Sequence, residues 1–144
     1  MYILNADYQT MNIKLDSMIP RIPPYVHNFS ISNYNDTART DLNIEYTLSL
    51  RTTTNLPLIY ELYLNEEHDD TGANNIIISN TSGVDADGTY FRTITTNPKT
   101  FGYKNDEINF YQLVIYFPEI YTATQYQDVI EGVEIIVNSR QILN

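Results

Sequence analysis

The chain has 144 residues, which suits a single domain. It carries 18 acidic and 8 basic side chains, for a formal net charge of -10. Nucleic acids and anionic lipid surfaces both select basic proteins, so the charge argues against either partner. The chain has no cysteine, which excludes disulfides, zinc thiolate sites and cysteine nucleophiles.

No targeting or membrane segment is evident. The chain has no run of about 18 apolar residues, so we expect no membrane insertion. Its first residues lack the basic and apolar regions of a signal peptide. The sequence leaves open whether Met1 is a native start or begins a cloned mature form.

The first expected strand lies near the N-terminus, in YQTMNIKLDSMI. There Met11, Ile13 and Leu15 alternate with polar residues, which is typical of a half-buried strand. The segment PRIPPY follows, and its consecutive prolines predict an extended linker that pairs with no strand. We therefore divide the chain into an N-terminal strand or arm, residues 1–20, and a β-sandwich domain, residues 21–144.

Alternation with period two continues along the domain. It predicts strands at residues 25–33, 41–52 and 58–64. The short apolar run at residues 74–79 predicts a strand covered on both faces, and the segment NTSGVDADGT that follows is expected to be a turn. Residues 89–96 are β-branched and aromatic and predict another strand.

The C-terminal third completes the pattern. Residues 107–118 are the most apolar segment, so we expect them in the centre of a sheet. The last strand is expected at residues 128–142, with glutamates on both faces, which suggests a bulge at Gly132. The composition of 13 tyrosines suits strands with one half-exposed face. Together these elements predict an all-β fold: a single antiparallel β-sandwich or jelly roll of about seven to nine strands.

No catalytic constellation is visible in the sequence. The two histidines, His27 and His68, stand in unlike settings, one in an alternating strand and one in an acidic loop. No G-x-S-x-G turn positions a nucleophile. We therefore expect a protein that is not an enzyme.

One segment has the beginning of a calcium loop. VDADGT places Asp85 and Asp87 before Gly88, as in the D-x-D-G opening of such loops. A full loop needs a bidentate glutamate at its twelfth position, which here is Thr96, although the acidic residues of EEHDD could add oxygens if the loops met. Asp85 and Asp87 are therefore our only candidate metal ligands, and we expect no other cofactor. The alternative is a solvated turn with Gly88 at a positive φ.

Three stretches resemble a known group of proteins. They are FSISNYNDTARTDLNIEYTLSLRTTTNLPLIYELYLNEE, NFYQLVIYFPE and YQDVIEGVEIIVNSRQI, which together span Phe29 to Ile142. Their succession is similar to that of small secreted β-sandwich proteins of Firmicutes. These proteins are processed by the SipW-type signal peptidase and are distantly related to TasA and camelysin. The resemblance implies an exported, jelly-roll-like domain without an active site. Some of these relatives form extracellular fibres in which an N-terminal strand completes a neighbour's sheet.

Our leading hypothesis is a non-enzymatic structural protein of the cell surface or a biofilm matrix. It would associate with itself or with another surface protein, with Met11, Ile13 and Leu15 as the apolar face of an exchangeable strand. An equally open interpretation is that this strand folds back as the first strand of its own sheet, since both use the same edge. The alternatives for function are a virus or phage structural protein, in a capsid or tail, and a carbohydrate- or calcium-binding module.

Overall fold

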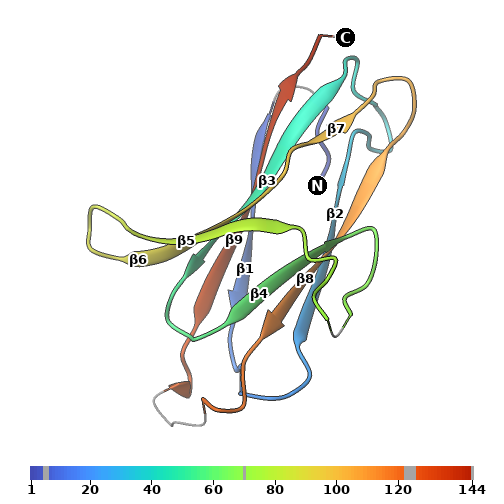
Figure 1. Cartoon of the computed structure of the whole chain (residues 1–144). Helices are drawn as coiled ribbons and strands as arrows, with labels where there is room; N and C mark the ends of the chain where they lie inside the picture. Colours follow the sequence, from blue (N-terminus) through green and yellow to red (C-terminus); the bar gives the residue numbers. More distant parts are fainter. Residues whose placement is uncertain (5–6, 70, 122–125, 144) are drawn as a thin grey trace.

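The computed structural model describes residues 1–4, 7–69, 71–121 and 126–143. Those residues form nine β-strands, which Figure 1 shows in sequence colours. In chain order the strands are β1 (Tyr8–Leu15), β2 (Tyr25–Ser32), β3 (Ile44–Thr53), β4 (Ile59–Leu64), β5 (Ile77–Val84), β6 (Tyr90–Thr96), β7 (Lys99–Phe101), β8 (Ile108–Tyr116) and β9 (Glu131–Gln141).

The strands pair into two antiparallel sheets. The six-stranded sheet has the order β1-β9-β3-β6-β5, and the short β7 also pairs with β3. The second sheet has three strands in the order β2-β8-β4, so β8 is central in it as predicted. The prediction of a single all-β domain with a sandwich-like arrangement of about seven to nine antiparallel strands is confirmed.

The core lies between the two sheets and follows from the alternation in the sequence. In β3 every second residue is buried, from Ile44 to Thr52. In β8 the residues Tyr111, Leu113 and Ile115 are buried on the facing sheet. Burial of an apolar side chain of this size contributes about 1.5–3 kcal/mol, so these two strands supply a large part of the packing energy.

A tyrosine pair joins the two sheets inside this core. The hydroxyl oxygens of Tyr46 in β3 and Tyr111 in β8 lie 2.7 Å apart, and Asn109 Nδ2 donates to the Tyr46 hydroxyl at 2.6 Å. The Phe29 ring stacks on Tyr111 with 5.2 Å between centroids. Burial raises the pKa of both tyrosine hydroxyls, so both stay protonated and available for hydrogen bonding.

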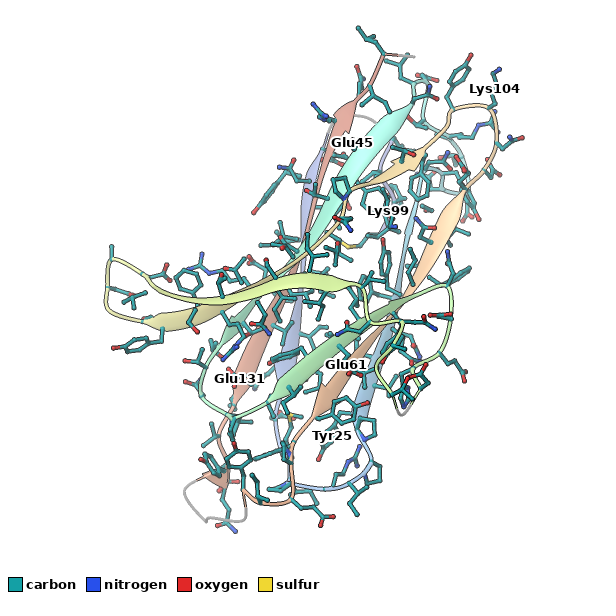
Figure 2. All side chains as sticks on the ribbon, viewed as in Figure 1. Tyr25, Glu45, Glu61, Lys99, Lys104 and Glu131 are labelled. Atoms are coloured by element: carbon teal, nitrogen blue, oxygen red, sulfur yellow. The ribbon has the colours of Figure 1, made fainter. Side chains whose placement is uncertain are left out.

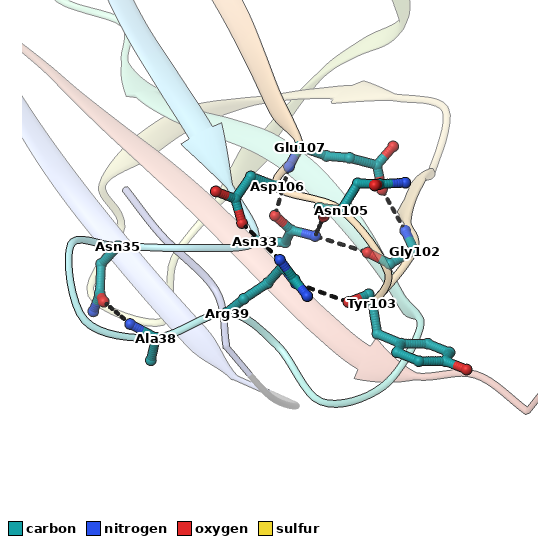
Figure 3. A network of polar contacts seen from close by, with 9 residues as sticks. All are labelled: Asn33, Asn35, Ala38, Arg39, Gly102, Tyr103, Asn105, Asp106 and Glu107. Carbon is teal, nitrogen blue, oxygen red and sulfur yellow. Dashed lines mark hydrogen bonds and ion pairs between the residues drawn. The ribbon is translucent and has the colours of Figure 1, made fainter.

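A polar network closes one end of the sandwich (Figure 3). The buried Asn33, just after β2, donates from Nδ2 to the carbonyls of Gly102 and Asn105, at 2.8 and 3.0 Å. Its Oδ1 accepts from the backbone N–H of Glu107 at 2.7 Å. The side chain thereby ties the loop after β2 to the loop between β7 and β8, and its burial is compensated by hydrogen bonds.

The prediction for residues 74–79 is wrong in position and in burial. The strand β5 runs from Ile77 to Val84, lies at a sheet edge, and is mostly exposed. It includes half of the segment that was expected to be a turn, so the actual turn is confined to residues 85–89. Only Ile76 and Ile77 of the apolar run pack against the core, and the strand then leaves the sandwich as a hairpin with β6 (Figure 1).

The predicted bulge at Gly132 is also wrong. The pairing of β9 with β1 continues without a register shift through Gly132 to Glu131, and the regular pairing with β3 ends at Val133. Glu131 therefore lies on the inner face with Val133, and Glu134 lies on the outer face. A glutamate is tolerated on the inner face because its carboxylate accepts several hydrogen bonds, as described below.

The tyrosine pair gives the first prediction. Tyr46→Phe should destabilise the protein more than Tyr111→Phe, by about 1–2 kcal/mol, because it leaves the Tyr111 hydroxyl buried without its partner. Tyr111→Phe still leaves Tyr46 with the Asn109 donor. Urea unfolding followed by circular dichroism measures both losses. Equal losses, or a larger loss for Tyr111→Phe, would contradict this assignment of the hydrogen bonds.

Candidate functional site

The predicted self-assembly residues lie on β1, at one edge of the six-stranded sheet. Residues 8–15 pair antiparallel with residues 131–138 of β9 without interruption. Met11, Ile13 and Leu15 are half-buried and pack against the core. The structure thus brings the three residues together on the core side of their own chain's sheet, so β1 is folded back here. Its exchange between chains stays a prediction.

The segment before β1 is attached to both sheets. The backbone N–H of Ile3 donates to the carbonyl of Ser32 in β2 at 2.8 Å, and the N–H of Ser32 donates to the carbonyl of Met1 at 3.0 Å. The Ile3 side chain is fully buried. Asp7 and Ser139 then exchange backbone hydrogen bonds at the start of the β1–β9 ladder. The N-terminal arm therefore fastens one side of the sandwich across both layers.

The linker after β1 is held in place, although it pairs with no strand. Met18 is buried, and the N–H of Arg21 donates to the Phe117 carbonyl at 2.9 Å. The Arg21 guanidinium lies 3.6 Å from the Tyr25 ring centroid. Ser17, before these contacts, has a φ of 54°. A left-handed backbone costs a residue other than glycine about 1–2 kcal/mol. The junction between β1 and the anchored linker is therefore strained.

A groove of about 510 Å³ lies on the outer face of the six-stranded sheet, beside β1. Its lining includes two basic and two acidic side chains from four segments: Lys14, Arg51, Asp85 and Glu134. Phe91 of β6 also lines the groove. These charges balance in sign, so the groove does not favour a strongly charged ligand.

One wall of this groove is built by close packing over a glycine. The Arg51 guanidinium lies 3.9 Å from the Phe91 ring centroid and pairs with the carboxylate of Asp85. Phe91 lies across Gly83 on the neighbouring strand, where a Cβ atom would be only 2.6 Å from the ring. Glycine at residue 83 therefore leaves room for the tip of the Phe91 ring, where a larger residue would displace it.

The structure places the two calcium candidates in the β5–β6 turn, each with a protein partner. Asp85 pairs with Arg51. Asp87 Oδ1 accepts from the N–H of Thr89 at 2.9 Å, and hydrogen bonds from Thr89 hold the pKa of Asp87 below its usual value. Among the described residues, no three His, Cys, Asp or Glu side chains are grouped to hold a metal ion. Calcium binding by Asp85 and Asp87 stays a prediction that the geometry does not strengthen.

Sequence reasoning missed the structural importance of Glu131, at the start of β9 (Figure 2). Its side chain is fully buried. Its Oε2 accepts from the N–H of Leu56 at 2.7 Å, its Oε1 accepts from the N–H of Asn55 at 3.2 Å, and the Thr53 hydroxyl also donates to it. Burial raises its pKa, and these hydrogen bonds oppose the rise. The carboxylate fixes the loop between β3 and β4.

Comparison with known proteins does not assign this chain to a family. We found no protein family, no curated protein and no solved structure that matches this chain. Within the ranges that the structure describes, no helix has the length and apolar character needed to cross a membrane.

The packing at residue 83 gives the second prediction. Gly83→Ala should lower the free energy of unfolding by about 1–3 kcal/mol, because the new methyl group overlaps the Phe91 ring. Gly132→Ala is the matched control, since its Cβ would meet Thr53 Cγ2 at an ordinary 3.8 Å. Urea unfolding measures both variants. If Gly83→Ala were as stable as Gly132→Ala, the close contact between β5 and Phe91 would be wrong.

The third prediction is that the free energy of unfolding depends on pH through the protonation of Glu131. A raised pKa means that the folded state binds the proton more tightly than the unfolded chain. Its contribution to stability is therefore fully present below the unfolded pKa of about 4.3 and is lost as pH rises through the folded pKa. The stability of the native protein relative to Glu131→Gln should fall across this range.

The measurement is urea unfolding of both proteins between pH 4 and pH 8, with Glu134→Gln as control. Glu134 lies on the outer face of the same strand, so this variant removes one charge without touching the buried carboxylate. A stability difference between native protein and Glu131→Gln that stayed constant or grew with pH would refute the raised pKa.

Proposed function

We propose that the protein is a non-enzymatic structural β-sandwich that acts outside the cell, at the cell surface or in a matrix, and self-associates by exchanging β1. One observation carries the proposal. Between the edge strand β1 and the anchored linker stands Ser17, whose left-handed backbone makes this junction a strained hinge. The location outside the cell rests on the resemblance of the strand sequences to secreted β-sandwich proteins.

The hinge at Ser17 lies between the residues that would leave with β1 and the residues that would keep their contacts with the sandwich. Met18 and Arg21 follow Ser17 in the chain, so their contacts with the core and with Phe117 can persist when β1 leaves. Residues 1–16 would move as one unit, and they carry both the contact of Ile3 with β2 and the whole β1–β9 ladder.

The energetics of exchange then depend on the hinge. The same ladder forms whether β1 comes from its own chain or from a neighbour, so strand pairing does not distinguish the two states. An extended hinge relieves the left-handed strain at Ser17, which favours exchange by about 1–2 kcal/mol. The loss of entropy on association opposes exchange, so the equilibrium between single and exchanged chains depends on protein concentration.

Exchange between copies would build an open assembly. Each chain donates residues 1–16 to one neighbour and accepts the same segment from another. Such a contact is heterologous, and when its rotation does not close a ring it extends into a filament. A partner with a similar strand, such as another surface protein, could occupy the same edge of β9.

The hinge gives the fourth prediction. Ser17→Pro should increase oligomers, because proline fixes φ near -65° and cannot adopt the folded-back conformation, whereas Ser17→Gly should reduce them by removing the strain. Size-exclusion chromatography with light scattering, and negative-stain microscopy, measure the assembly of both variants and the native protein over a range of concentrations.

The two variants change the same residue in opposite directions, which makes each the control of the other. Circular dichroism confirms that both retain the sheet signal. If Ser17→Pro and Ser17→Gly showed the same state of association at every concentration, exchange through this hinge would be excluded.

A further inference from the structure

The strands at the two ends of each sheet are not equally protected. In the three-stranded sheet, Ile3 pairs with the end of β2, and residues 75–76 cover β4, where Ile76 N–H donates to the Leu62 carbonyl at 2.9 Å. In the six-stranded sheet, β1 carries the charged Lys14. The strand β5 contains no charged residue and no proline. β2 also lacks both, but Met1 and Ile3 form backbone hydrogen bonds with its last residues, Ser30 and Ser32, whereas no such bond from a described residue covers β5. Uncharged edges of this kind are open to pairing with another strand.

The register of the hairpin shows which groups of β5 are free to pair. Asp85 N–H donates to the Thr89 carbonyl at 2.9 Å, so residue 85 directs its backbone groups towards β6. In an antiparallel ladder, successive residues direct their backbone N–H and C=O groups alternately towards and away from the paired strand. The pairing from Ser79 to Val84 has no register shift, so this alternation is unbroken there. Asn80, Ser82 and Val84 therefore direct their N–H and C=O groups away from β6. No other described segment pairs with β5 along this edge.

The charge distribution indicates what can approach this edge. The protein has a net charge of -10, so two copies repel each other over most surfaces. From Thr71 to Val84 the chain has no charged residue, and the next one, Asp85, is paired with Arg51. Figure 1 shows the β5–β6 hairpin extending away from the remaining strands. Two acidic copies can meet edge to edge here without placing like charges opposite each other.

We propose that β5 is a self-association edge, at which two copies pair β5 with β5 in antiparallel orientation around a two-fold axis at Ser82. In this register Ser82 faces its own counterpart, and Asn80 of each copy faces Val84 of the other. All three outward-directed residues then form ladder hydrogen bonds, and the two six-stranded sheets become continuous. Val84, which is 56% exposed in the single chain, is covered by the neighbouring strand.

This interface is independent of β1 exchange. The strands β1 and β5 lie at opposite edges of the six-stranded sheet, so one can be occupied while the other is free. The β5 contact is isologous and joins two copies, whereas exchange of β1 extends a chain of copies. Combined, they would pair filaments side by side. A ladder of one strand pair is a small interface, so we expect weak, rapidly reversible association.

Amide hydrogen exchange measured by NMR tests the proposal at the level of single residues. In the Ser17→Gly background, which disfavours β1 exchange, the amides of Asn80, Ser82 and Val84 should become at least about tenfold slower to exchange as protein concentration rises into the millimolar range. The amides of Thr81 and Gly83 are the internal control, since they already bond to β6. Outward amides that exchange at one rate at all concentrations would overturn the proposal.

A pair of variants tests the same edge by sedimentation equilibrium. Ser82→Pro removes an outward N–H and no hydrogen bond within the chain, so it should raise the dissociation constant at least about tenfold. Ser82→Ala keeps the N–H and should leave it within about twofold of the native value. Equal association of the two variants would overturn β5 pairing. If that occurred while Ser17→Pro still formed oligomers, β1 exchange would stand without this second interface.

Discussion

The outer edge of β9 must be occupied by a strand, and the rest of the fold depends on that pairing. β9 bonds to β3 on one side and β1 on the other. Its inward residues Val133, Ile135 and Val137 are almost fully buried. Without β1 the half-buried Met11, Ile13 and Leu15 would no longer cover this side of the core. The ladder does not specify which chain supplies the strand, and this freedom is what the proposed function uses.

At the outer edge of β9, the backbone strain at Ser17 opposes the contacts that fasten the N-terminal arm. Ile3 and the β1 ladder fasten the arm to the sandwich, while the backbone of Ser17 disfavours the folded-back connection. Beyond the hinge, Arg21 and Met18 hold the linker on the sandwich. The same hydrogen bonds form in both states, so in the proposed exchange the strain at Ser17 is set against the entropy of association. Protein concentration can then decide between them.

The buried parts of the fold could be predicted from the sequence, because burial imposes a period of two. The alternation in β3 and the apolar character of β8 identified both strands, and the apolar character of β8 also indicated its central place in its sheet. The edge strand β5 was placed wrongly, since a strand exposed on its edge and faces has little apolar pattern to detect. Glu131 was missed as a buried group because its partners, Asn55 and Leu56, are far away in the chain.

The candidate site was predictable only in part, for related reasons. The alternating Met11, Ile13 and Leu15 do share a face, and local spacing is enough to show that. The hinge at Ser17 has no sequence signal, because serine rarely adopts a positive φ. The contact of Arg51 with Phe91 and Asp85 depends on three separate segments that only the folded sheet brings together.

Exchange of β1 is tested most directly by a disulfide between β1 and β9. The native chain has no cysteine, and Asn12 lies opposite Glu134 on the outer face, so Asn12→Cys with Glu134→Cys places one pair of thiols across the ladder. After oxidation at high protein concentration, the chains are separated under denaturing, non-reducing conditions. Strand exchange predicts a ladder of covalently linked chains that disappears on reduction. Cross-linked monomers alone, at every concentration, would contradict it and leave β1 as a strand of its own sandwich.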